Sequence, residues 1–464
     1  MKKAILLICF QFILLQSLNA QIISAGTSHA VFLCDGEVYT WGGNDEGELG
    51  LGYFSPANNN TPQQVPALSN VTAVYAGSNH TLALKADGDV WSWGYNNKGQ
   101  LGNGTNSNSA SPVQVASLSN IVALGAGGSH SLALASDSTV WAWGRNQMGQ
   151  LGDGSNTNTN IPVKVKNLAG VIAIACGGIC SMALKYDGTV WAWGGNSSGL
   201  LGNNNVPSSN IPVLVNGLPF IKAISMGSCA MALAADSTVW MWGFNGNGEL
   251  GNGTYNDSYI PTQTSSISGI VSISNGGGHS LAIKSDGTLW SWGFNYTGQL
   301  GDNSTVNKNI PGQINSISNV INIGSGAWFS FAQKNDGSLW AWGDNGNGQL
   351  GDGTTINYSK VPVQSLATCF ATNVSESAPF SLKLKIYPNP TSRDITVAIE
   401  NEENVEDLVI TVNTISGTEL YKQAAAHSHS FILDLSSIPP GVYMLRVASK
   451  SKPHLYRVEK LVVY

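Results

Sequence analysis

Residues 127–144, with the sequence GGSHSLALASDSTVWAWG, decide the fold of this chain. Apolar residues alternate over 129–134 and again over 139–143, which predicts two short β-strands, because successive side chains of a strand point to opposite faces. Asp137-Ser138 lies between them. The chain repeats this stretch several times, and most of the other copies have Asp-Gly here, a sequence typical of tight turns. The stretch therefore predicts a β-hairpin with Trp141 and Trp143 on one face.

The same pattern recurs along the chain. Six copies carry Trp-x-Trp-Gly, and the first copy has Tyr39 in place of the leading Trp. Each copy adds an apolar run before the hairpin, such as 121–124, and a Gly-rich loop after it, such as 146–154. A Pro-containing outer strand follows, as around Pro162, where Pro is tolerated at a sheet edge. The Trp-Gly pairs, 49 to 52 residues apart, begin at Trp41, Trp93, Trp143, Trp193, Trp242, Trp292 and Trp342.

A period near 50 with several strands per unit and no helical pattern indicates a β-propeller. We therefore predict an all-β fold with a seven-bladed propeller over residues 21–367. Residues 22–26 begin in the middle of a repeat, and residues 361–366 supply the part that normally precedes it. We expect these two ends to complete one blade and so to close the ring.

The composition limits the classes of partner. Of 464 residues only 11% are charged, where about a quarter is usual, and acids outnumber bases by 28 to 22. No run of Lys and Arg is long enough to follow a phosphate backbone, so nucleic acid is not the expected partner.

Residues 1–20 are typical of a secretory signal peptide. Lys2 and Lys3 precede an apolar run over 4–15, which is too short to span a membrane, and Leu18-Asn19-Ala20 is a suitable cleavage end. We expect cleavage between Ala20 and Gln21, no lipid attachment at Cys9, and no transmembrane segment in the mature chain. The product should be secreted or reach the outer cell surface through the periplasm.

The repeats resemble the regulator of chromosome condensation family. The match rests on Gly-His-Ser-Leu-Ala-Leu, Asp-Gly and Trp-Gly-x-Asn-x-x-Gly-Gln-Leu-Gly, and it covers roughly residues 22–367. The resemblance implies a seven-bladed propeller. The eponymous member is a guanine-nucleotide exchange factor for the GTPase Ran, but a chain with a signal peptide would not meet a cytosolic GTPase. The uniform spacing also leaves no room for a wedge-like insertion, so exchange is the least favoured function.

The repeat stops near residue 367, and a polar linker is expected over 368–380. Residues 381–464 contain turn signals and apolar runs that predict a small Ig-like β-sandwich. We expect its strands near 383–387, 394–400, 407–415, 419–424, 430–435, 441–448 and 456–463.

This segment resembles the C-terminal sorting domain of the type IX (Por) secretion system of Bacteroidetes. The resemblance implies that the type IX machinery recognises the domain at the outer membrane and that the domain is commonly removed. The terminal Val462-Val463-Tyr464 departs from the usual polar or basic ending of the family. The residues that carry the motif are Tyr387, Pro388, Asn389, Pro390, Gly417, Gly441, Tyr443 and Lys460.

Residues that recur at one repeat position would form rings around the propeller axis, so we considered each ring as a site. His29, His80, His130 and His279 share a position that Cys180, Cys229 and Phe329 take in the other blades. Because these replacements break the ring, we expect no metal there and expect the histidines to bond to the backbone near the turn. Turn chemistry explains the turn Asp residues without catalysis. The Asn/Asp/Gly loops, such as 252–257, could offer oxygen ligands to calcium, but no acid spacing repeats strictly enough to predict a site.

No catalytic or cofactor-binding motif appears, so we expect neither an enzyme nor a cofactor. The paired Trp residues are expected to pack between sheets. Trp328 and Phe329 break the repeat pattern and are candidates for a surface feature. Five cysteines remain after residue 20, and two disulfides are conceivable in an oxidising compartment, Cys180 with Cys229 and Cys34 with Cys369.

The sequence thus favours a secreted binding or interaction module with an unknown protein or glycan ligand on the propeller. By resemblance, a secreted propeller of this repeat type clamps β-lactamases with one face, which makes a protein partner credible. The alternative is a carbohydrate-binding or carbohydrate-active protein. A pocket of convergent acids would favour an enzyme, and a flat face rich in Trp, Tyr and Asn would favour protein or glycan binding.

Overall fold

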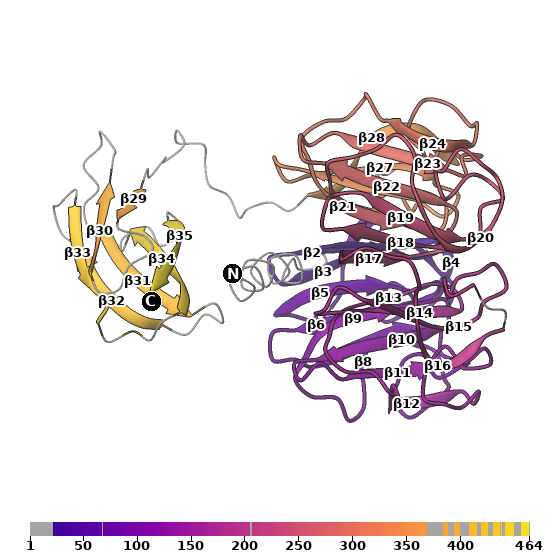
Figure 1. The fold of residues 1–464 in the computed structure, drawn as a ribbon, viewed down its shortest axis with the longest axis horizontal. Helices are drawn as coiled ribbons and strands as arrows, with labels where there is room; N and C mark the ends of the chain where they lie inside the picture. The colour runs from indigo at the N-terminus through magenta and orange to yellow at the C-terminus, as the bar shows by residue number, and fades with distance from the viewer. Residues whose placement is uncertain are drawn as a thin grey trace. The chain divides into compact units, whose positions relative to one another are not determined.

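The computed structural model describes residues 22–464 except 67, 205–206, 369–383, 388–393, 400–407, 415–418, 426–429, 437, 439–440, 450–455 and 464. The chain divides into two compact units, residues 1–370 and 371–464, which we describe one at a time (Figure 1). The described part is built of strands, and no helix in it is long and apolar enough to cross a membrane. Residues 1–21, which include the predicted cleavage site at Ala20 and Gln21, lie outside the described residues.

The first unit is a propeller of seven four-stranded antiparallel sheets. The first three blades are β1 (Ile23–Ala25), β2 (His29–Cys34), β3 (Glu37–Asn44), β4 (Ser55–Gln64); β5 (Val71–Ala76), β6 (His80–Lys85), β7 (Val90–Gly94), β8 (Ser109–Gln114); and β9 (Ile121–Ala126), β10 (His130–Ala135), β11 (Val140–Gly144), β12 (Thr159–Lys164). The fourth and fifth are β13 (Val171–Cys176), β14 (Cys180–Lys185), β15 (Val190–Gly194), β16 (Ser209–Leu214); and β17 (Ile221–Met226), β18 (Cys229–Ala234), β19 (Val239–Gly243), β20 (Ser258–Gln263). The last two are β21 (Ile270–Asn275), β22 (His279–Lys284), β23 (Leu289–Gly293), β24 (Lys308–Gln313); and β25 (Val320–Ser325), β26 (Phe329–Lys334), β27 (Ser338–Asp344), β28 (Tyr358–Thr368).

The hairpin predicted from residues 127–144 is present. β10 and β11 pair with Leu132 opposite Ala142 and Ala133 opposite Trp141. Ser138 adopts a φ of 67°, the left-handed conformation that Gly takes at this turn in other blades. The second Trp of each pair is completely buried between sheets, as at Trp143, whereas the leading Trp is half-buried. The prediction of a seven-bladed all-β propeller is confirmed.

The predicted way of closing the ring is wrong. Each blade consists of four consecutive strands, so the first and last blades are separate. Residues 361–366 lie in β28 and pair with β27 of their own repeat, with Trp340 opposite Gln364. The structural unit therefore starts at the inner strand, and the Pro-containing strand ends a blade rather than beginning one.

The junction between the last and first blades uses the same contacts as the other junctions. Trp41 Nε1 donates to the carbonyl oxygen of Gln349 at 2.8 Å, just as Trp93 Nε1 donates to that of Glu48 at 2.7 Å. The equivalent Trp of every other blade makes the same bond to the preceding blade. Non-covalent contacts that repeat around the ring thus close it.

The second unit contains two sheets that share one hydrophobic core. The core joins Ile395 and Leu433 of the first sheet to Ile410, Tyr443 and Leu461 of the second. All seven strands lie where the sequence predicts them. The sheets have the strand orders β29 (Leu384–Tyr387), β30 (Asp394–Ile399), β33 (Ser430–Asp434) and β32 (Glu419–Ala425), β31 (Leu408–Thr414), β34 (Gly441–Ser449), β35 (Tyr456–Val463).

Candidate functional site

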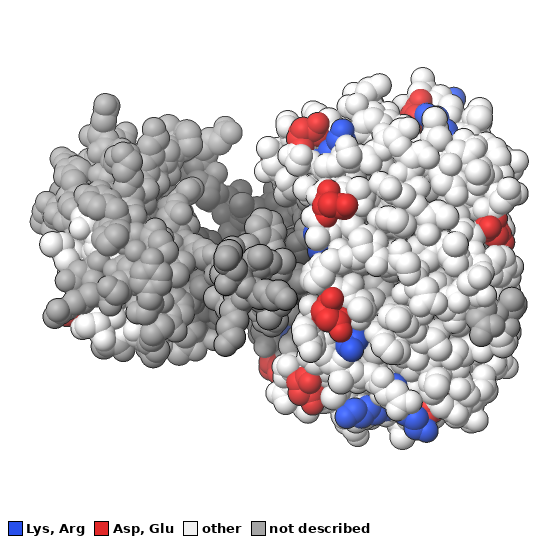
Figure 2. Space-filling view, viewed as in Figure 1, with Lys and Arg blue, Asp and Glu red and all other residues white. Residues whose placement is uncertain are grey.

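The propeller has two ends with different connections. At one end, which we call the loop face, lie the connections from the first to the second strand and from the third to the fourth strand of each blade. At the other end, the turn face, lie the Asp turns and the connections between blades. Most of the propeller surface visible in Figure 2 carries no charge, and acidic side chains are spaced along one edge.

The Asp turns are structural. Asp137 accepts hydrogen bonds from the hydroxyl of Thr139 at 2.7 Å and from its backbone N–H at 3.0 Å. These bonds stabilise the carboxylate and lower the pKa of Asp137. Equivalent side-chain bonds occur at Asp187, Asp236, Asp286 and Asp336. Five of the seven turn acids thus accept from a hydroxyl group of their own turn, which explains them without a catalytic role.

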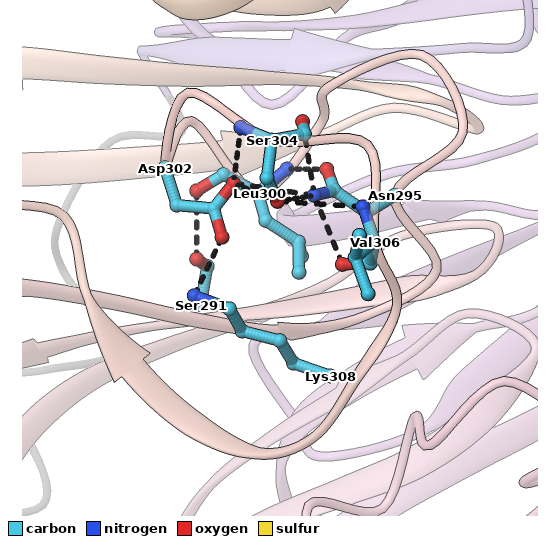
Figure 3. Close-up of polar contacts among 7 residues, drawn as sticks. All are labelled: Ser291, Asn295, Leu300, Asp302, Ser304, Val306 and Lys308. Atoms are coloured by element: carbon cyan, nitrogen blue, oxygen red, sulfur yellow. Dashed lines mark hydrogen bonds and ion pairs between the residues drawn. The ribbon is translucent and has the colours of Figure 1, made fainter.

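The long loops of the loop face are organised by a buried Asn, as Figure 3 shows for Asn295. Its Oδ1 accepts from the N–H of Leu300 at 2.9 Å, and its Nδ2 donates to the carbonyl oxygens of Ser304 at 3.2 Å and Val306 at 3.1 Å. In this blade Asp302 also pairs with Lys308 at 2.5 Å. Burial opposes ionisation of Asp302, but the bonds from Lys308 and Ser304 prevail and lower its pKa. One amide thus fixes a loop that has little regular structure.

Four histidines connect neighbouring blades through hydroxyl groups. Each hydroxyl also donates its one proton to a loop carbonyl, as Ser131 does to Gln100 at 2.9 Å. It must therefore accept from the imidazole, which places the ring proton on Nε2. The pairs, 2.8 to 3.0 Å apart, are His29 with Thr81, His80 with Ser131, His130 with Ser181 and His279 with Ser330.

Burial keeps these imidazoles neutral. Desolvation lowers the pKa of His29, His130 and His279 to about 3 and that of His80 to about 4. The expectation that these rings bond to the backbone near the turn is wrong, because their partner is a side chain of the next blade. In the described part of the chain, no three His, Cys, Asp or Glu side chains are grouped so that they could hold a metal ion.

The blades without a histidine show compensating changes. Cys180 packs with Ala230, which occupies the position that Ser or Thr takes in the blades following a histidine. Phe329 packs with Ala30, which occupies the same position in the first blade. At the junction after Cys229, the Nδ2 of Asn275 donates to Cys229 Sγ at 3.2 Å and to Ser280 Oγ at 2.9 Å, so the amide replaces the imidazole. A partner for each residue at the histidine position is therefore provided by the next blade.

The predicted disulfide between Cys180 and Cys229 is not formed, because both are free thiols. Each belongs to a different blade junction, because Cys180 packs with Ala230 of the fifth blade while Cys229 contacts Asn275 of the sixth. Burial raises the pKa of both thiols to about 12. Cys34 is disulfide-bonded and its partner lies outside the described residues, so the pairing with Cys369 stays a prediction.

A channel of about 430 Å³ runs along the propeller axis. Its wall consists of the inner strands and their Gly-rich ends, and among the residues that the structure describes no Asp, Glu, His, Lys or Arg lines it. At six of the seven junctions a backbone N–H at its rim donates to a carbonyl of the next blade, ending with Ala327 to Gly26 at 3.0 Å. The channel therefore offers backbone groups and small side chains, not the convergent acids of a glycoside-cleaving site.

Two buried acids escaped the sequence reasoning. Glu48 and Glu249 replace the Gln of the Gly-Gln-Leu-Gly loop, and burial raises the pKa of both carboxyl groups. They nonetheless make the loop contact that Gln makes elsewhere: Glu249 Oε2 accepts from the N–H of Asn247 at 2.9 Å, as Gln100 Oε1 accepts from that of Lys98 at 3.0 Å. Their role in the fold is thus that of the repeat residue they replace.

Aromatic side chains gather on the loop face of the last three blades, and we call them the aromatic arc: Phe244, Phe294, Tyr296 and Trp328. Tyr296 is 68% exposed, Trp328 47% and Phe244 36%. The rings of Phe294 and Tyr296 are 4.8 Å apart, and the Thr297 hydroxyl of the same loop donates to the carbonyl oxygen of Trp328 at 3.3 Å. Of the pair singled out from the sequence, Trp328 is on the surface and Phe329 is fully buried.

The arc residues occupy positions that vary between repeats. Phe244 and Phe294 stand where other blades have Gly43, Tyr95, Arg145, Gly195 or Asp344, and Trp328 stands where others have Ser28, Asn79, Ser129, Ile179, Ser228 or Gly278. Only Trp328 was noticed in the sequence. Aligning all seven repeats and reading the variable columns would have found the others.

The sorting-motif residues lie in the second unit. Tyr387 ends β29, Gly441 begins β34, and Lys460 lies in β35 opposite Met444. Tyr443 is buried in the core of this unit. Pro388, Asn389, Pro390 and Gly417 lie outside the described residues.

Comparison with known families agrees with this architecture. The RCC1-like domain matches residues 11–268, which is more than half of the chain. The chain belongs to the RCC1-like domain family. Regulator of chromosome condensation (RCC1) repeats match residues 286–333 and 336–375, and a second form of the repeat matches 270–299 and 320–349. A secretion system C-terminal sorting domain matches 385–464, which indicates export to the cell surface or secretion.

Several RCC1-like proteins share part of this sequence. The probable E3 ubiquitin-protein ligase HERC3 of Homo sapiens is 44% identical over 95 residues, 19% of this chain and 9% of that protein. The ultraviolet-B receptor UVR8 of Arabidopsis thaliana is 37% identical over 93 residues, 19% of this chain and 21% of that protein. The chain thus covers about a tenth of the ligase and a fifth of the receptor.

Solved structures share the fold over a longer stretch. Human WBSCR16 has a TM-score of 0.65 at 21% identity, covering 71% of this chain and 95% of that chain. Prp20p from Saccharomyces cerevisiae has a TM-score of 0.66 at 25% identity, covering 73% and 88%. These likenesses establish the propeller, and the activities of the relatives do not follow from it.

Proposed function

We propose that this chain is an exported binding module that holds a protein partner on the aromatic arc of its loop face. The observation that carries the proposal is that the positions free to vary between repeats display four aromatic side chains on three adjacent blades. Aromatic residues are enriched in the centres of protein interfaces, because they bury much apolar area with few rotatable bonds.

The arc is held on a rigid support. A backbone hydrogen bond fixes Phe294, whose N–H donates at 2.8 Å to the carbonyl oxygen of Gly278, the residue just before the second strand of the same blade. Phe244 lies over Gly246, whose missing side chain makes room for the ring. A partner would therefore meet a surface that is already ordered, which lowers the entropic cost of binding.

The one acid beside the arc that we identify, Asp344, is already hydrogen-bonded within its own loop, so an apolar partner surface would not have to satisfy it. Asp344 neighbours Trp328, and its carboxylate already accepts from Gln349 Nε2 at 2.7 Å and from the Gly346 N–H at 3.2 Å. A glycan is the alternative ligand for this face, since exposed Tyr and Trp rings also stack on sugars.

For export, we propose removal of residues 1–20, passage through the periplasm and recognition of residues 385–464 by the type IX machinery of a Bacteroidetes cell. Deleting residues 385–464 should leave the propeller inside the cell envelope, and mass spectrometry of the exported form should show Gln21 as its first residue. A surface or medium form of the deletion variant in normal amount would contradict this route.

The binding experiment uses variants that copy other blades. We expect Trp328→Ser and Phe294→Gly, which restore residues found at these positions elsewhere in the chain, to weaken binding of the partner at least tenfold without changing the melting temperature much. The partner is first captured on the purified protein from secreted proteins of the native community, and its affinity is then measured with both components purified.

Tyr186→Ala provides the matched control, because Tyr186 is 55% exposed but lies on the turn face. A saturable protein partner that binds the arc variants as tightly as the unchanged chain would refute the proposed face. Saturable binding on a glycan array, lost in the same variants, would replace the protein by a glycan ligand.

A further inference from the structure

Three lysines and a tryptophan line an open cavity of about 630 Å³ on the turn face, between the third and fourth blades. Lys164 ends β12 and Lys166 lies in the connection that follows, while Lys185 and Trp191 come from β14 and β15. Figure 2 shows blue side chains along the lower edge of the propeller, where Figure 1 places β12. The cavity volume falls within the range of about 300–1,000 Å³ that is usual for ligand sites. We call this cavity the lysine pocket.

Lys164 departs from the repeat in a way that changes the charge. Most blades have Gln at this position, and in the first two blades it bonds to an acid: Gln64 Nε2 to Glu37 Oε2 at 2.8 Å and Gln114 Nε2 to Asp89 Oδ2 at 3.0 Å. In the third blade the acid position is Thr139. An amide with an acidic partner has thus become a cation without that partner. The nearby acid, Asp137, accepts from Thr139, and the charge of Lys164 also contributes to lowering the pKa of Asp137.

The Lys185–Trp191 pair has equivalents in other blades, but only this pair among those compared lies beside two further lysines. Lys185 Nζ lies 5.5 Å from the centre of the Trp191 ring and 3.7 Å from Asp187. Lys284 and Lys334 contact their own Trp residues in the same way. The positions equivalent to Lys164 and Lys166 are neutral beside those pairs, namely Gln263 with Ser265 and Gln313 with Asn315. The third junction therefore gathers three cations where the equivalent places have one.

We infer that the lysine pocket binds a carboxylated or sulfated sugar unit of an acidic polysaccharide. Lysine ammonium groups bind carboxylate and sulfate oxygens through charge-assisted hydrogen bonds. The exposed part of Trp191 and the side chain of Leu168, which also lines the pocket, offer an apolar surface for a sugar ring. An acidic peptide would satisfy the charges but brings no sugar ring whose C–H groups could stack on Trp191. The pocket is separate from the aromatic arc and does not depend on it.

The test measures binding of defined oligosaccharides to the purified chain by calorimetry at low ionic strength. The probes are oligogalacturonate, a sulfated heparin fragment, neutral oligogalactose and polyglutamate. We expect at least one of the two acidic saccharides to bind, and binding to weaken tenfold or more in the double variant Lys164→Gln with Lys166→Asn. Both changes restore residues that other blades carry at these positions, so the fold should be kept. Affinity should also fall as salt rises.

Two further variants separate the explanations. Lys284→Gln removes a lysine equivalent to Lys185 at another junction and should leave the affinity unchanged. Trp191→Tyr, which copies Tyr39 of the first blade, should weaken binding of the acidic saccharide and leave any binding of polyglutamate unchanged. Equal binding of neutral oligogalactose, an unaltered affinity in the double variant, or no binding of either acidic saccharide at millimolar concentration would overturn the inference. Binding of polyglutamate alone would assign the pocket to acidic peptides instead.

Discussion

At the scale of single residues, the matching of a histidine in one blade to a hydroxyl in the next explains changes that look irregular along the chain. Where the histidine becomes Cys180 or Phe329, the hydroxyl becomes Ala230 or Ala30. Without the imidazole, the hydroxyl oxygen would lose the donor from which it accepts, and an Ala at this position leaves no buried polar group partly unpaired. The two positions are at least 50 residues apart, so the pairing becomes visible only when neighbouring blades are placed side by side.

The neutral histidines should make the propeller sensitive to acid. Their pKa is about 3 to 4 in the folded chain, whereas an unfolded chain has the ordinary value of 6.5. Below pH 6.5 the unfolded state therefore binds more protons, and stability falls as the pH drops through this window. At pH 5 each histidine should cost about 2 kcal/mol relative to neutral pH. Denaturant unfolding followed between pH 7.5 and pH 4.5 measures this loss.

The control copies the junction that lacks a histidine. His130→Cys combined with Ser181→Ala reproduces the pair Cys180 and Ala230, so this variant should lose less stability on acidification than the unchanged chain. Ser181→Ala alone leaves His130 Nε2–H without an acceptor and should cost about 1–3 kcal/mol at neutral pH. An acid sensitivity that is the same in the double variant and the unchanged chain would show that other groups cause it.

At the scale of elements, one buried Asn per blade holds the long loop in place, because its side chain forms hydrogen bonds with several backbone groups of the loop. Asn295 satisfies an N–H and two carbonyl groups of its loop (Figure 3). The loop then holds Phe294 and Tyr296 of the aromatic arc in place. The hydrogen bonds of a single side-chain amide therefore order the loop that displays these proposed binding residues.

Asn295→Asp should disturb this loop while sparing the strands. The carboxylate can still accept from the Leu300 N–H, but it cannot donate to the carbonyl oxygens of Ser304 and Val306, and it places a second charge near Asp302. We expect a loss of about 2–4 kcal/mol in the free energy of unfolding, given the lost bonds and the buried charge. Hydrogen exchange should accelerate in residues 296–308, with β22 and β23 still protected.

Asn335→Asp is the comparison, because it makes the same chemical change at an exposed position. It should leave the hydrogen-exchange pattern unchanged. The free energy of unfolding should change by no more than about 0.5 kcal/mol, the usual range for surface substitutions. If both variants behaved alike, the loop would not depend on the Asn295 amide.

How far the sequence predicted the structure also becomes clear at this scale. Strands, turns and blade number follow from local patterns that repeat seven times, so an error in one copy is corrected by the others. The partners of His130 and Cys180 depend on contacts between blades, which no local pattern contains. The aromatic arc was partly missed because Phe244 and Phe294 occupy variable positions, which the shared repeat pattern does not describe and which only a column-by-column alignment of the repeats reveals. The lysine pocket was missed because Lys164 and Lys185 come from neighbouring repeats and gain meaning only together.

At the scale of the whole molecule, the ring closes without sharing a strand between its ends. The last junction has the contacts of the others: the Trp41 bond to Gln349, the Ala327 bond to Gly26, and the packing of Phe329 with Ala30. It differs in having no chain connection across it, so it is where the ring would open first. A covalent link between the two ends would therefore have most effect there.

We predict that a disulfide between Cys34 and Cys369 supplies this link, since Cys34 ends β2 of the first blade and Cys369 follows β28 of the last. Cys34→Ser and Cys369→Ser should each lower stability by about 2–5 kcal/mol under oxidising conditions, because the open chain gains conformational entropy on unfolding. The double variant should be no less stable than either single variant, and a reductant should bring the unchanged chain to the same level. Cys176→Ser, which changes a free thiol and leaves the disulfide in place, should lose as much stability on reduction as the unchanged chain does. Peptide mapping that joined Cys34 to any other cysteine, or a Cys369→Ser variant as stable as the unchanged chain, would refute the link and leave closure to the non-covalent contacts alone.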